Sequence, residues 1–206
     1  GDMRNVILLC TMLMLISCDR SPAINIAPGP QQLVRLSDSE IKGLDPQKIS
    51  DLSSLRVAAD QFEGLTRLDA SGEAEPALPA LLAHPAMAAI PLHRVRQAGD
   101  QWTSDRPMIA SGPYRLAEWK LNDYARLARN PQWHDGQAPT ATIIWKPMED
   151  SLSALRLFLS DGADIAADYP PSRHRWLRDN HPDIAHSVPY FGSYYFAFNT
   201  QRAPFD

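Results

Sequence analysis

One stretch constrains the fold more than any other, because residues 39–68 carry the signals of a turn, a helix and a strand in succession. Pro46 fixes its own φ angle and disfavours helical backbone just before it, so a turn is expected there. Ser50 or Asp51 can cap a helix, because a short side-chain oxygen accepts a hydrogen bond from the first turn. Gly64 stands where a left-handed helix end is favoured. The apolar residues at helical spacing are Leu52, Leu55, Ala59 and Phe62. The stretch therefore predicts one helix packed on a sheet.

Short strands and helices alternate along the rest of the 206-residue chain. The residue pattern predicts strands over residues 33–36, 113–119, 124–129, 142–145, 163–166, 184–188 and 194–199, the second and third joined as a hairpin. It predicts one short helix near residues 80–83, one from a cap at Glu149 or Asp150 to a stop at Gly162, and one from a cap at Ser172 to Arg178. The apolar stripe of the second helix is Leu152, Leu155 and Leu159. Strands that alternate with helices indicate the α/β class with a mixed sheet.

Charge and side-chain spacing argue against nucleic-acid binding, metal binding and catalysis. The net charge is −4, which does not favour a nucleic-acid partner. The closest histidines, His174, His181 and His186, lack the i, i+4 spacing of a metal-binding helix and have no cysteine beside them, so no metal site is expected. Ser111 lacks the Gly-x-Ser-x-Gly surroundings of a hydrolase nucleophile. The chain is therefore not expected to be an enzyme.

The first 32 residues carry the signals of export. A positive charge precedes an apolar run over residues 6–16 that is too short to span a bilayer. Cys18 follows this run directly after a serine, an arrangement that resembles a bacterial lipobox. The resemblance implies removal of residues 1–17 as a signal peptide, lipid on Cys18 and, through Asp19, retention at the inner membrane. An ordinary secretory signal with an incidental cysteine is the alternative. Residues 18–32 are expected to form a flexible tether.

Several short motifs follow one another along residues 33–206. The first of them are Leu33-Val34-Arg35, Ser39-Glu40-Ile41, Gly43-Leu44-Asp45-Pro46, Phe62-Glu63-Gly64-Leu65 and Pro76-Ala77-Leu78. The later ones are Gly112-Pro113-Tyr114, Trp119, Asn122-Asp123, Arg129-Asn130-Pro131, Trp133, Gly162-x-Asp164-Ile165, and Tyr194-Tyr195 with Asn199 and Pro204-Phe205. In these motifs the chain resembles the periplasmic oligopeptide-binding proteins, which are extracellular solute-binding proteins of family 5. Such proteins are the substrate-binding components of peptide ABC transporters.

The resemblance implies a fold, a ligand and partners. The fold would be an α/β, mixed-sheet lobe of a type II periplasmic binding protein. The ligand would be an oligopeptide, captured in the periplasm and delivered to an ABC permease in the inner membrane. The backbone of Ser39, Glu40 and Ile41 would line the peptide. Tyr194 and Tyr195 would lie near the hinge, with one of the two in the core. Binding of this type needs no catalytic group, cofactor or metal.

The chain also departs from the family pattern at two places. Only a short segment, near residues 79–110, stands where such proteins carry an inserted subdomain. The second lobe, with the acidic residue that pairs with the peptide's amino group, would begin after Asp206. Residues 33–206 are therefore expected to form an incomplete first lobe. Two other functions stay open: a non-transporting structural or interaction lipoprotein derived from such a lobe, and a nickel or metal-chelate binder.

Overall fold

The computed structural model describes residues 28–64, 84–104, 108–186 and 201. The chain divides into a larger unit, residues 1–168, and a smaller unit, residues 169–206. Several predicted features lie outside the described residues: Cys18, the helix near 80–83, the strand over 194–199, Tyr194 and Tyr195.

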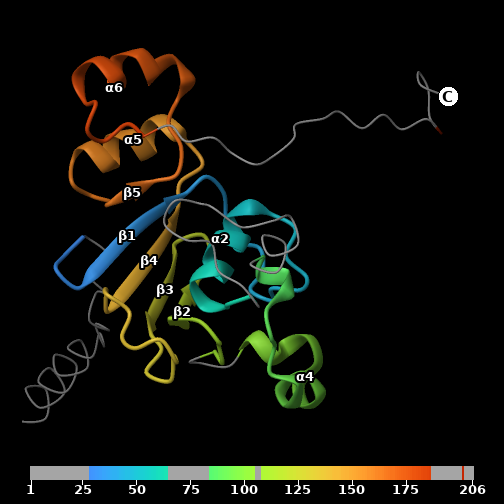
Figure 1. The fold of residues 1–206 in the computed structure, drawn as a ribbon. Coiled ribbons are helices and arrows are strands. Elements are labelled where there is room, and N and C mark those ends of the chain that lie inside the picture. The colour runs from blue at the N-terminus through green and yellow to red at the C-terminus, as the bar shows by residue number, and fades with distance from the viewer. Residues whose placement is uncertain (1–27, 65–83, 105–107, 187–200, 202–206) are drawn as a thin grey trace, which may run out of the picture. The chain divides into compact units, whose positions relative to one another are not determined.

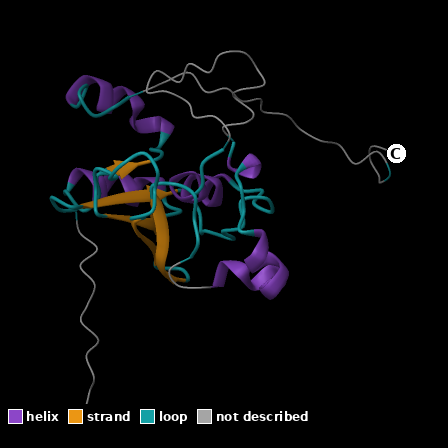
Figure 2. Ribbon diagram, turned by 60° about the horizontal axis from the view of Figure 1, so that its bottom comes forward, coloured by secondary structure: helices purple, strands orange, loops and turns teal. Residues whose placement is uncertain are grey.

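The larger unit is built on one five-stranded mixed sheet, drawn in orange in Figure 2. Its strands are β1 (Gln32–Ser37), β2 (Tyr114–Lys120), β3 (Tyr124–Arg129), β4 (Thr142–Pro147) and β5 (Ile165–Ala166), in the order β2-β3-β4-β1-β5. The first three in this order pair antiparallel, and β4, β1 and β5 pair parallel. These strands confirm the first five predicted ones, including the hairpin, although β5 is only two residues long.

Helix α2 (Leu52–Gln61) begins as predicted but buries a different face. Asp51 is its N-cap, and its side chain accepts a hydrogen bond of 2.8 Å from the backbone N–H of Ser54. The predicted apolar stripe is wrong at Leu52, which is 40% exposed, and at Ala59, which is also exposed, whereas Phe62 is buried as predicted. The buried face consists of Ser53, Ser54, Val57, Ala58 and Gln61. The predicted end at Gly64 is also wrong, because the C-cap is Phe62, in extended conformation.

Two hydrophobic clusters lie on the two faces of the sheet, as alternation along β4 requires. Ile143 and Trp145 belong to the cluster that includes Val57 and Ala58 of α2. Ile144, between them, belongs to the cluster with Ala154 of helix α5 (Ser151–Leu159). The two helices therefore cover opposite faces of the sheet (Figure 1).

Helix α5 confirms its predicted cap but only part of its predicted stripe. Asp150 is the N-cap and accepts from the backbone N–H of Ser153 at 2.7 Å. Leu155 is buried, whereas Leu159 is 37% exposed, so the predicted stripe is wrong at its last position. The helix ends at Leu159, before the predicted stop at Gly162, and the left-handed residue after it is Asp161, with φ of 59°.

The sequence reading missed the helical segments between residues 85 and 104. They are the short 3₁₀ segments η1 (Pro85–Met87) and η2 (Gly99–Ser104), with α4 (Leu92–Ala98) between them. A signal for α4 was present, since Pro91 is its N-cap and Gly99 is its C-cap with φ of 55°. Proline at a helix start and glycine at its end are a known asymmetry.

The smaller unit contains the 3₁₀ segment η3 (Pro171–Arg173) and helix α6 (His174–Asn180). The helix occurs where it was predicted, but the cap at Ser172 is wrong. Pro170 and Arg173 stand at the two N-cap positions, and neither makes a side-chain capping bond. Residues 184–186 are turn and irregular, so the strand predicted from residue 184 does not begin there. In the described part of the chain, no helix has the length and apolar character needed to cross a bilayer.

Candidate functional site

The topology of the sheet marks one edge as the place for a site. Strands β1 and β4 are parallel neighbours, with Ser37 opposite Pro147 at their carboxyl ends. The chain continues from β1 to α2 on one face of the sheet and from β4 to α5 on the other face. Ligands of open α/β sheets bind at such switch points, outside the carboxyl ends of the strands.

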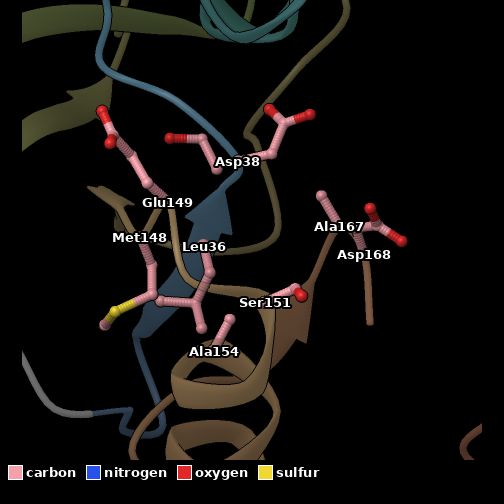
Figure 3. Close-up of a pocket in the computed structure, with 9 residues that line it drawn as sticks. Leu36, Asp38, Met148, Glu149, Ser151, Ala154, Ala167 and Asp168 are labelled. Carbon is pink, nitrogen blue, oxygen red and sulfur yellow. The ribbon is translucent and has the colours of Figure 1, made fainter. Parts of the chain in front are cut away.

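A cavity of about 170 Å³ opens at this switch point (Figure 3). The backbone N–H of Met148 donates to the carbonyl oxygen of Ser37 at 2.8 Å, which ties the two strand ends together. The lining residues are Leu36, Ser37, Asp38, Met148, Glu149, Ser151, Ala154, Ala167 and Asp168. The volume suits one side chain or a small polar group rather than a whole cofactor.

Three carboxylates surround this cavity but do not converge. Those of Asp38, Glu149 and Asp168 point to different sides in Figure 3. Among the described residues, no three His, Cys, Asp or Glu side chains are placed to hold a metal ion. Spread carboxylates give the rim a negative field, which attracts an ammonium or guanidinium group.

The segment from Asp38 to Leu44 begins at this cavity, which Asp38 lines, and runs on as irregular chain, outside any helix or strand. Among the described residues, no backbone–backbone hydrogen bond is made by residues 38–44. Side chains hold the segment instead: the hydroxyl of Ser54 accepts from the backbone N–H of Lys42 at 2.9 Å. Free backbone donors and acceptors in such a segment can pair with the backbone of an extended ligand.

The predicted ligand segment lies in this stretch, and its three side chains have different surroundings. Ser39 Oγ donates to Ser53 Oγ at 2.9 Å. Ile41 is only 1% exposed and belongs to the core on the α2 side, so a ligand could meet its backbone but not its side chain. Oε1 of Glu40 is buried and has no hydrogen-bond partner among the described residues.

Sequence reasoning missed the residues of the second strand end. Met148, Glu149 and Ser151 join the cavity only because β4 pairs in parallel with β1. The signal available was the polar run after a buried strand, immediately before a capped helix. The sequence-predicted Cys18, Tyr194 and Tyr195 lie outside the described residues.

A mixed sheet with helices on both faces and a cavity at its switch point defines one lobe of a periplasmic binding protein. Comparison with protein families gives the particular family. The model of the bacterial extracellular solute-binding proteins, family 5 (middle region), matches residues 67–206, and the chain belongs to this family.

Known relatives are peptide-binding proteins by name. The chain is 28% identical over 128 residues to the periplasmic oligopeptide-binding protein OppA of Salmonella typhimurium. That match covers 61% of this chain and 24% of the relative. The chain is also 27% identical over 109 residues to the periplasmic murein peptide-binding protein MppA of Escherichia coli. This second match covers 52% of the chain and 20% of the relative. The chain therefore spans about a quarter or less of these relatives.

Solved structures share the fold over a longer stretch. The Escherichia coli murein tripeptide-binding protein MppA matches with a TM-score of 0.74 and 19% identity, over 87% of this chain and 54% of that one. Haemophilus influenzae OppA, in complex with the peptide RPPGFSPFR, matches with a TM-score of 0.73 and 17% identity, also over 87% and 54%. These likenesses agree with the predicted α/β lobe.

Proposed function

We propose that this chain is part of an extracytoplasmic solute-binding component of an ABC importer and that it takes oligopeptides. The observation that carries the proposal is the segment 38–44, which begins at the cavity of the switch point and in which the backbone groups of Glu40 and Ile41 make no hydrogen bond to the described part of the chain. An extended peptide would lie along Ser39, Glu40 and Ile41 as an added strand. Its partner for delivery would be an ABC permease in the inner membrane. Membership of the solute-binding family and the names of the relatives support this choice of ligand.

The proposed function is binding alone, without a chemical change of the ligand. Backbone pairing supplies affinity without regard to sequence, and the cavity beside it accommodates one group of the ligand. The acidic rim of Asp38, Glu149 and Asp168 favours a ligand with a positive charge at that point. Tyr194 and Tyr195 are proposed to contribute from the hinge side.

The proposal is tested by adding trialanine and trilysine to the isotope-labelled chain and following backbone amide signals by NMR. Saturable shifts are expected at residues 38–44, with a dissociation constant between about 10 µM and 1 mM, because contacts from one lobe bind weakly. Shifts that are absent from residues 38–44 in a well-dispersed spectrum would show that the segment is not a peptide site.

The Glu149→Gln variant tests whether the acidic rim favours a positively charged peptide. Glu149 is exposed on the rim, so its removal leaves the core and the strand ends intact. Trilysine is expected to bind about twofold to fivefold more weakly to the variant, as for other exposed charge pairs, while trialanine binds equally to both. Added salt should shrink the difference. An equal loss for both peptides would contradict a charge effect.

We also propose that residues 1–17 are a signal peptide, that residues 18–32 are a tether, and that residues 33–206 form the partial lobe. Lipid on Cys18 would hold the protein at the periplasmic face of the inner membrane. In cells, the amino-terminal peptide of the mature protein is expected to begin at Cys18 and to carry lipid in mass spectra of the membrane fraction. Cys18→Ser should release the protein from that fraction. Cleavage elsewhere, with an unmodified thiol, would refute the anchor.

A further inference from the structure

Two adjacent buried serines stand in the first turn of α2, facing the proposed peptide segment. Ser53 and Ser54 are both 0% exposed, although serine is a common surface residue. A buried hydroxyl is costly unless it is hydrogen-bonded, so the partners of these two side chains explain why they point inward. All of those partners, apart from the helix itself, lie in residues 38–43.

Ser54 holds the far end of the segment. Its Oγ accepts from the backbone N–H of Lys42 at 2.9 Å and from that of Gly43 at 3.3 Å. A serine hydroxyl has two acceptor lone pairs, so one oxygen can receive both bonds. The backbone of Ser54 meanwhile donates to the Asp51 cap. The residue therefore links the start of α2 to the turn that follows the peptide segment.

Ser53 holds the near end through a relay of hydroxyl groups. Ser39 Oγ donates to Ser53 Oγ at 2.9 Å, and Ser53 Oγ donates to Oδ1 of Asp38 at 2.7 Å. Ser37 Oγ adds a bond of 2.9 Å to the carbonyl oxygen of Ser39. The guanidinium of Arg56, one turn along α2, lies 3.5 Å from the same oxygen of Asp38. Asp38 also lines the cavity, so the relay reaches the rim.

We propose that Ser53 and Ser54 are positioning residues that hold residues 38–43 ready to pair with the backbone of a ligand; this inference rests on the proposed function. The serines fix the segment at both ends through their side chains. Glu40 and Ile41 lie between these two ends, and their backbone groups have no hydrogen-bond partner in the described part of the chain. They are therefore available to pair with a ligand. A segment already held in place costs less conformational entropy to order on binding.

The experiment compares Ser53→Ala, Ser54→Ala and the double variant with the unaltered chain. Amide hydrogen exchange and the NMR titration with trialanine are measured on each. Exchange at Lys42 and Gly43, whose amides donate to Ser54 Oγ, is expected to accelerate at least tenfold in the double variant, while amides of β3 and β4 keep their protection. Trialanine is expected to bind about tenfold more weakly, since the ordering cost moves to the binding step.

Two variants serve as controls. Ser160→Ala removes a serine hydroxyl that bonds only to Leu157 in its own helix, and it should change neither readout. Ser39→Ala cuts the relay from the loop side and leaves α2 intact, so it tests the relay even where a helix variant does not fold. Weaker trialanine binding is expected from it as well, while the amides of Lys42 and Gly43 keep their bonds to Ser54.

The outcomes separate this inference from the proposed function. A double variant with unchanged exchange at Lys42 and Gly43 would overturn the positioning role. So would exchange that rises throughout the sheet, since that describes a general loss of stability. If the unaltered chain binds no trialanine, the proposed function fails, and local exchange still reports whether the serines hold the segment.

Discussion

Gly112→Ala is expected to destabilise the larger unit by about 2–4 kcal/mol, among the larger effects of a single methyl group. A Cβ at this position would lie 2.8 Å from the carbonyl carbon and 2.9 Å from the carbonyl oxygen of Gln61. Both atoms belong to the backbone at the end of α2, so no side chain can move aside to make room. The N–H of Gly112 also donates to that carbonyl at 2.7 Å, and a shift of either backbone would weaken the bond.

Neighbouring contacts make the same junction rigid. The side-chain oxygen of Gln61 accepts from the backbone N–H of Leu116 at 3.0 Å, where β2 begins. Nδ2 of Asn130 donates to the carbonyl oxygens of Ala110 and Gly112 at 3.1 and 2.9 Å. The segment before β2 is therefore held on both sides and cannot relax away from the new methyl group.

Urea unfolding of the Gly112→Ala and Gly43→Ala variants measures this effect against a matched glycine. Gly43 has no atom within 4 Å of its hypothetical Cβ and is not among the positive-φ glycines. Its replacement is expected to leave stability unchanged or to raise it slightly, because alanine restricts the unfolded chain. Equal stability of the two variants would show that the close approach to Gln61 does not exist in solution.

Gln61 also shows where sequence reasoning about α2 stopped. The Asp51 cap follows from local chemistry, because a capping carboxylate needs only the first turn of its own helix. The buried face of α2 does not follow from local chemistry, because it depends on distant partners. Ser53, Ser54 and Gln61 point inward to partners from residues 38–43 and 112–116. Apolar periodicity assumes that polar side chains face water, and here they replace missing backbone bonds of the loops instead.

The candidate site was half predictable for a related reason. The motif at Ser39, Glu40 and Ile41 pointed to the segment after one strand end, which begins at the cavity with Asp38, and the contact of these three residues with a peptide stays a prediction. Glu149 at the other strand end could not be joined to it, since the parallel pairing of β1 with β4 links residues that are 110 positions apart, as Gln32 and Thr142 are. Periodicity predicts that a strand exists, but its neighbours depend on the whole core.

Asp60→Ala is expected to cost about 2–4 kcal/mol, because it leaves the buried indole N–H of Trp145 and the half-buried guanidinium of Arg35 without their partner. Oδ2 of Asp60 accepts from Nε1 of Trp145 at 2.8 Å, and Trp145 is 1% exposed. Nη1 of Arg35 lies 3.3 Å from Oδ1, and its guanidinium lies 4.3 Å above the Trp145 ring. Asp100→Ala is the control, since its partner Lys48 is exposed and the pair contributes little. Equal thermal stability of the two variants would contradict a structural role for Asp60.

Asp60→Asn tests the charge of the same side chain, because an amide oxygen can still accept from Trp145. Burial raises the pKa of the Asp60 carboxyl above its ordinary value of 3.8, and attraction to Arg35 offsets only part of this rise. As pH rises, the unfolded chain therefore loses this proton before the folded chain does. The stabilisation from Asp60 is complete below pH 3.8 and declines as pH rises through the folded-state pKa. Unfolding free energies measured on both proteins should show the unaltered chain losing stability relative to Asp60→Asn over that interval. A relative gain with rising pH would mean that the ion pair with Arg35 outweighs the cost of burying the carboxylate.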